Sequence, residues 1–114
     1  MTQASGNETL AHAIAEQAGL ECRRWFGGWS LRDAGEQVAI VMDTLYLRVD
    51  DALRTRLEAA GDSRPFRYLR RDGREIEVNA YWAVPPHLLD NPAALRALID
   101  CVPIASQQRT TRTQ

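Results

Sequence analysis

The sequence contains no apolar run near the roughly 20 residues that a membrane-spanning helix needs. Its opening residues, MTQASGNETL, also lack the basic start and apolar middle of a signal peptide. Positive charge is not in excess either: the formal net charge is −1, so the long-range field typical of non-specific nucleic-acid binding is missing. We therefore expect a cytoplasmic protein without membrane contact, in which nucleic-acid binding would need a local basic patch.

Residues suited to metal or redox chemistry are few. The two cysteines, Cys22 and Cys101, form no CxxC pair and have no neighbouring histidine. His12 falls in a predicted helix and His87 follows a Pro-Pro turn, and neither has a cluster of further ligand candidates near it. No serine stands in a nucleophile elbow, and the glycine spacing is not that of a phosphate loop. The sequence predicts no catalytic residue, no cofactor and no metal site.

What is present is the balance of a single globular domain, with 45% hydrophobic and 25% charged residues. Apolar spacing and capping signals predict helices that begin after Asn7, Asp50 and Asn91. Strands are predicted in 23–32, 38–42 and 45–49 and in a hairpin over 66–84. This order predicts a two-layer α+β fold, α-β-β-β-α-β-β-α, with an antiparallel sheet and helices packed mainly on one face. We assign 1–6 to a flexible N-terminus, 7–103 to the domain and 104–114 to a disordered polar tail.

The second strand of the predicted hairpin alternates between apolar and polar residues. Such alternation is typical of an antiparallel strand with one buried and one solvated face. The pattern therefore predicts a single core face made of Ile76, Val78, Ala80 and Trp82, and a polar face made of Glu75, Glu77, Asn79 and Tyr81.

The same hairpin carries four arginines, Arg67, Arg70, Arg71 and Arg74. They could bind phosphates or an acidic partner, which would make the hairpin an anion or nucleic-acid patch. They could instead pair across the hairpin with Glu75 and Glu77. We favour the pairing, because neighbouring carboxylates cancel most of the local positive potential.

The stretch RRWFGGWSLR, from Arg23 to Arg32, concentrates arginines and aromatic residues around a glycine pair. We interpret it as the first strand of the sheet, in which Gly27-Gly28 allows a bulge or a close backbone approach. In a chain with 7% aromatic residues, the aromatic side chains of this stretch are expected in the core or at a subunit interface.

Five motifs together resemble the N-terminal domain of the TfoX/Sxy family, bacterial proteins associated with the regulation of natural competence. They are RRWFGGWSLR, YLRVDD, PFRY, YWAVP and the final NPAALRALI helix, and the resemblance extends over roughly Leu10 to Val102. Trp25 stands where the family pattern has methionine before Phe-Gly-Gly, so packing around this strand is expected to differ.

The resemblance implies the α-β-β-β-α-β-β-α fold and a protein that is not an enzyme. In the best-known members it implies a transcriptional co-regulator that works with the DNA-bound cyclic-AMP receptor protein. Full-length regulators carry a second, C-terminal domain without a counterpart in this sequence, so protein contact or dimerisation is the role expected here. The motif residues carried over, for fold or partner contact, are Arg23, Arg24, Phe26, Gly27, Gly28, Tyr46, Asp50, Tyr81 and Trp82.

Three functions remain as hypotheses. The first is a regulatory module that contacts a transcription-related protein and forms a homodimer. The second is direct nucleic-acid binding by the Arg67 to Arg74 hairpin together with Arg23-Arg24. The third is a small ligand-binding or enzymatic domain with a pocket between the helices and the sheet.

Overall fold

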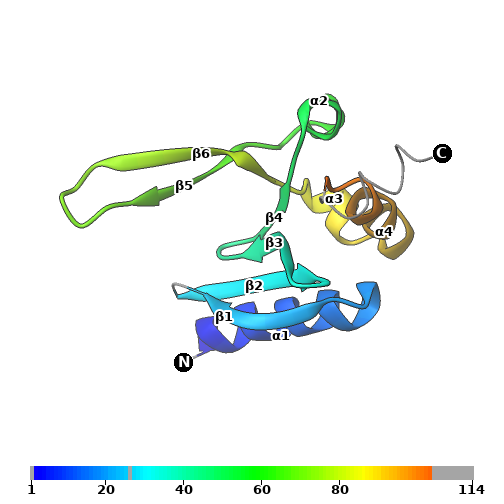
Figure 1. Ribbon diagram of the computed structural model, residues 1–114, viewed down its shortest axis with the longest axis horizontal. Coiled ribbons are helices and arrows are strands. Elements are labelled where there is room, and N and C mark those ends of the chain that lie inside the picture. The colour runs from blue at the N-terminus through cyan, green and yellow to red at the C-terminus, as the bar shows by residue number, and fades with distance from the viewer. Residues whose placement is uncertain (1, 26, 104–114) are drawn as a thin grey trace.

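A computed structural model of the protein describes residues 2–25 and 27–103, with side chains from residue 8 onward. Figure 1 shows the arrangement of its helices and strands. In chain order they are α1 (Thr2–Ala18), β1 (Glu21–Trp25), β2 (Gly28–Asp33), β3 (Glu36–Val41), β4 (Leu45–Arg48), α2 (Asp51–Ala60), β5 (Pro65–Leu69), β6 (Glu75–Ala83), α3 (Pro86–Leu89) and α4 (Pro92–Asp100). The predicted tail at 104–114 lies outside the described residues.

The strands of the described chain form one six-stranded sheet in the order β1-β2-β3-β4-β6-β5, and every neighbouring pair is antiparallel. The predicted α+β class and the order of elements are confirmed. The stretch from Arg23 to Arg32, however, forms two strands rather than one. Gly27, with a φ of 82°, stands at the reversal, and Trp25 pairs with Gly28 on its far side. A left-handed glycine at this point lets the chain fold back on itself.

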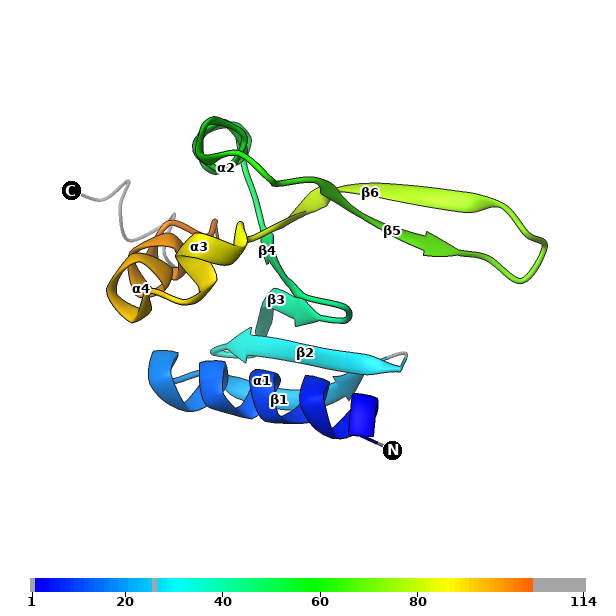
Figure 2. The same cartoon turned by 180° about the vertical axis from the view of Figure 1, so that it is seen from behind.

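One face of the sheet packs against helices. Buried residues of α1, α2 and α4 form a single core with strands β2, β3 and β4. The helix side contributes Ile14, Leu53, Leu57, Leu95 and Leu98, and the sheet side contributes Leu31, Ala39, Val41, Leu45 and Leu47. The β5–β6 hairpin extends away from α3 and α4 in both views (Figures 1 and 2).

Two of the three predicted helix starts are confirmed by their caps. Asp50 Oδ1 accepts a hydrogen bond from the Leu53 amide at 2.9 Å, and Asn91 Oδ1 accepts one from the Ala94 amide at 3.1 Å. The prediction for α1 was wrong, because this helix begins at Thr2 and contains Asn7. No proline precedes Asn7 to prevent the helix from starting earlier.

Strand β6 does not keep one apolar face, contrary to the prediction. Val78 packs in a cluster with Phe66, whereas Trp82 packs against the helix-side core. The cause is an irregularity in the β5–β6 pairing, where Pro65 lies opposite Trp82 but Phe66 lies opposite Val78. Consecutive residues of β5 point to opposite faces, and each shares its face with its partner. Val78 and Trp82 are therefore sent to opposite sides of the sheet.

Candidate interaction surface

The second face of the sheet carries an apolar cluster of its own, and we call it the open face. Its fully buried members are Ile40, Tyr46, Phe66 and Ala83, and Trp25, Met42, Val78 and Tyr81 pack against them. All of these residues belong to strands or to the turn after β3, and none belongs to a helix. Among the described residues, the helices thus cover one side of the sheet, and on the other side the strands themselves bury the centre of this cluster.

Phe66 lies at the centre of the aromatic part of the open face. Its ring centroid is 5.0 Å from that of Tyr46 in an edge-to-face arrangement and 6.0 Å from that of Tyr68 in a stacked one. Trp25 contributes a third ring at 6.4 Å. These distances are typical of favourable aromatic pairs, so β1, β4 and β5 are joined across the sheet by ring contacts.

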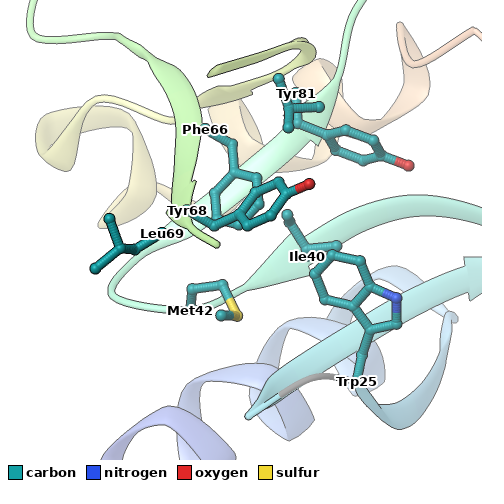
Figure 3. A pocket seen from close by; sticks show the side chains of 8 residues that line it. Trp25, Ile40, Met42, Phe66, Tyr68, Leu69 and Tyr81 are labelled. Carbon is teal, nitrogen blue, oxygen red and sulfur yellow. The ribbon is translucent and has the colours of Figure 1, made fainter. Parts of the chain in front are cut away.

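A pocket of about 640 Å³ is hollowed into the open face (Figure 3). Its lining contains no charged side chain and consists of Trp25, Ile40, Met42, Phe66, Tyr68, Leu69, Val78 and Tyr81. Two residues at its margin are well exposed, Tyr68 at 44% and Leu69 at 72%, and they are the exposed large hydrophobic residues of the described chain. A pocket of this composition accepts apolar or aromatic groups, and the polar side-chain groups of its lining are the hydroxyls of Tyr68 and Tyr81 and the indole of Trp25.

A short polar network holds Tyr81 at the edge of the pocket. Ser30 Oγ donates a hydrogen bond to Gln37 Oε1 at 2.6 Å, and Gln37 Nε2 donates one to the Tyr81 hydroxyl oxygen at 3.0 Å. Ser30 is buried, so the bond to Gln37 removes the cost of an unpaired hydroxyl inside the sheet. The network orients the Tyr81 ring toward the apolar cluster.

A second polar group surrounds Tyr46. The Tyr46 hydroxyl donates a hydrogen bond to Asp43 Oδ1 at 2.7 Å and accepts one from Arg64 Nη2 at 3.0 Å. Arg64 also forms an ion pair with Asp43 Oδ2 at 2.6 Å, and its guanidinium lies 5.7 Å from the Tyr46 ring centroid. This cluster ties the β3–β4 turn to the segment before β5. Burial of the Tyr46 side chain is the largest cause that raises its pKa from 10.0 to about 12, and the hydrogen bond to Asp43 is the next largest.

We expect this shift to appear in the pH dependence of stability. A phenol whose pKa is higher in the folded than in the unfolded state stabilises the fold fully below pH 10 and loses this contribution as the pH rises toward 12. The free energy of unfolding should therefore fall over this range by up to about 2 kcal/mol more in the wild type than in Tyr46→Phe. Urea unfolding at a series of alkaline pH values measures the difference. Equal slopes for the two proteins would contradict the assignment.

The family-motif residues do not converge on one site. Arg23 pairs with Glu21 at 3.0 Å at the edge of the sheet, and the Arg24 guanidinium lies 5.3 Å from the centroid of Trp29, which packs against the helix-side core. Phe26 lies outside the described residues.

The remaining motif residues have different structural roles. Asp50 caps α2, and Trp82 packs on the helix side with its Nε1 donating to the Asn79 carbonyl at 3.1 Å. Gly27 and Gly28 form the β1–β2 reversal described above. Of the predicted residues, the structure brings Tyr46 and Tyr81 together on the open face.

Several residues of the open face were not predicted as site residues. Phe66 and Tyr68 lie in the PFRY motif but were not carried over as site residues, and Met42 and Leu69 lie in no motif. The one available signal was the occurrence of Tyr68-Leu69 beside arginines in a segment predicted to be a solvated hairpin. An exposed apolar pair in such a position indicates a contact surface.

Acidic side chains neutralise part of the positive charge of the arginines in the β5–β6 hairpin. Arg67 pairs with Glu77 at 2.9 Å and Arg70 with Asp72 at 3.9 Å, whereas Arg71 and Arg74 have no ion-pair partner among the described residues. The hairpin forms one edge of the sheet, and β1, with Arg23 and Arg24, forms the other. Direct nucleic-acid binding stays a prediction that titration with DNA at low salt can check.

The structure also bears on metal binding, on membrane spanning and on the predicted ligand pocket. The described residues contain no group of three or more histidine, cysteine or acidic side chains that could hold a metal ion. Within the part of the chain that is described, no helix combines the length and apolar character needed to cross a membrane. The apolar pocket lies on the open face, not between helices and sheet as the third hypothesis placed it.

A known family model matches most of the chain. Residues 12–101 match the family model described as the TfoX N-terminal domain. No curated protein matches the chain. The matched range includes the residues that line the pocket, all of α2 and α4, and α1 from His12 onward.

Proposed function

Because the chain belongs to the TfoX N-terminal domain family, we propose that it is a small cytoplasmic regulatory module that acts in transcription through protein contacts. The open face is its contact surface. The observation that carries this proposal is the uncharged apolar pocket bordered by exposed Tyr68 and Leu69. We propose no catalytic step, since the pocket lining offers no acid, base or nucleophile pair.

The chemistry of the open face supports protein contact. Core regions of protein interfaces are poor in charge and rich in aromatic residues and methionine, and the pocket lining has this composition. Aromatic anchors seated in apolar hollows commonly dominate binding energy. The hydroxyls of Tyr46 and Tyr81 are already hydrogen-bonded within the chain, so a partner need not satisfy them.

The proposal is tested in the native host by deleting the gene and returning it in three forms. We expect deletion to change a defined set of transcripts, and the wild type and Ala93→Asp to restore them. Tyr68→Glu should fail to restore them, because it places a charge at the margin of the pocket. Ala93 is exposed near the start of α4, where an acidic residue is tolerated, so Ala93→Asp is the matched control.

RNA sequencing gives the readout, and immunoblotting confirms that all three forms accumulate equally. A deletion without effect on transcripts would contradict a role in transcription. Full restoration by Tyr68→Glu would show that the open face is not the contact surface.

A further inference from the structure

The open face is strongly concave, because the two edges of the sheet approach each other across it. Trp25 belongs to one edge strand, β1, and Phe66 to the other, β5. In a flat six-stranded sheet, spacings of about 4.8 Å would hold the edge strands about 24 Å apart. The two ring centroids are 6.4 Å apart, so the sheet curls around the open face. It has the form of an incompletely closed barrel, and small barrels can hold one small ligand in their interior.

The curl encloses the apolar pocket. Its deepest lining residues, Ile40 and Phe66, are 0% and 5% exposed. Figure 3 shows Trp25 and Met42 across the hollow from Phe66 and Tyr68. The volume of about 640 Å³ lies within the range of about 300 to 1,000 Å³ that is typical of small-molecule sites. A small molecule can therefore bury most of its surface between these walls.

The pocket lining selects the chemical class of the ligand. It contains no charged side chain, so an ionised ligand would lose hydration without gaining an ion pair in the pocket. The rings of Trp25, Phe66 and Tyr68 favour aromatic groups, which pack against rings in stacked or edge-to-face arrangements. The Tyr81 hydroxyl already accepts a hydrogen bond from Gln37 Nε2 at 3.0 Å, whereas the Tyr68 hydroxyl has no hydrogen-bond partner among the described residues. The Tyr68 hydroxyl is thus available to a polar group of the ligand.

We propose that this pocket is a binding site for a small, uncharged aromatic molecule with few hydrogen-bonding groups. The inference goes beyond the proposed function, which concerns contact with a protein at the open face. The ligand lies in the hollow between the two edges of the sheet, and it replaces water on apolar walls. The exposed Leu69 at the margin stays accessible when the hollow is filled.

Fluorescence titration of the purified full chain with N-phenyl-naphthylamine tests the proposal. This probe is uncharged and aromatic, and its emission rises in apolar surroundings. We expect saturable binding of one probe per chain with a Kd below about 100 μM. Anilinonaphthalene sulfonate carries the same rings and a negative charge, and it should bind at least about 10-fold more weakly. Absence of saturable binding would overturn the site, and equal or tighter binding of the sulfonate would overturn the uncharged class.

Two substitutions on β6 test whether the probe occupies the hollow. Val78 lines the pocket, so Val78→Phe places a ring inside it and should weaken binding at least about 10-fold. Asn79→Phe is the matched control, because it adds the same ring at an exposed neighbour that does not line the pocket. Its affinity should match that of the wild type, and circular dichroism verifies the fold of both variants. Unchanged affinity of Val78→Phe, or an equal loss in both variants, would overturn the assignment to this pocket.

A measurement on the wild type locates the probe without any substitution. In isotope-labelled protein, we expect filtered nuclear Overhauser effects from the probe to the methyl groups of Ile40 and Met42, which line the hollow. Contacts confined to methyl groups outside the pocket would contradict the proposal. All of these measurements use the purified chain alone, so their failure would leave the proposed function to be decided by the transcript experiment.

Discussion

Gly28→Val is expected to lower the free energy of unfolding by about 3 kcal/mol, the upper end of the range for inserting atoms into a packed site. A Cβ at Gly28 would overlap the Val41 carbonyl oxygen and Met42 Sδ. The Met42 side chain can rotate away, but the Val41 oxygen belongs to β3, which pairs with β2 at Trp29. The backbone contact therefore cannot be relieved without separating two central strands.

Gly27→Ala is the matched control for this prediction. Gly27 has a φ of 82°, but nothing lies within 4 Å of a Cβ added there. Its substitution should cost about 1 kcal/mol through backbone conformation alone. Urea unfolding followed by circular dichroism, at one fixed protein concentration, compares the two variants. A Gly28→Val protein as stable as Gly27→Ala would show that β2 and β3 do not approach as closely as described.

Phe66→Ala is expected to lower the free energy of unfolding by about 3 kcal/mol and to enlarge the pocket of the open face. Phe66 is 5% exposed and contacts the rings of Tyr46, Tyr68 and Trp25, so truncation removes all three contacts at once. These rings come from three strands, and their loss should weaken the attachment of the hairpin to the rest of the sheet.

Phe66→Leu separates the effect of lost volume from that of any substitution at this position. Leucine keeps most of the apolar volume, so its cost should stay below about 1.5 kcal/mol. Thermal and urea unfolding at one fixed protein concentration give both values. Equal stability of Phe66→Ala and the wild type would mean that the aromatic cluster does not contribute to the fold.

Part of the open face was visible in the sequence. Trp25 was expected in the core or at an interface, and Tyr81 was among the motif residues of the family resemblance; both line the pocket. Tyr68 was noted only as part of the PFRY motif, and Met42 and Leu69 were not identified, because nothing in their local sequence distinguishes a pocket margin from an ordinary strand. Trp82 was grouped with Val78, and the pairing irregularity beside Phe66 places the two on opposite faces.

Local sequence signals were sufficient for the features that depend on near neighbours. Asp50 and Asn91 cap helices through bonds to amides three residues away, and apolar spacing placed Leu95, Leu98 and Ile99 on the buried side of α4. The α+β class, the order of elements and the family followed from such local signals taken in series. They required no knowledge of which strands become neighbours.

The tertiary structure decided where the residues of separate strands meet. Gly27 reverses the chain and adds a strand, so Trp25 comes to lie near Phe66, forty-one positions along the chain. The irregular pairing of β5 and β6 turns Val78 toward the same cluster. Both outcomes depend on backbone register between segments far apart in sequence, which side-chain periodicity within one segment does not specify. The pocket is therefore a product of strand pairing, although each of its residues is an ordinary strand residue.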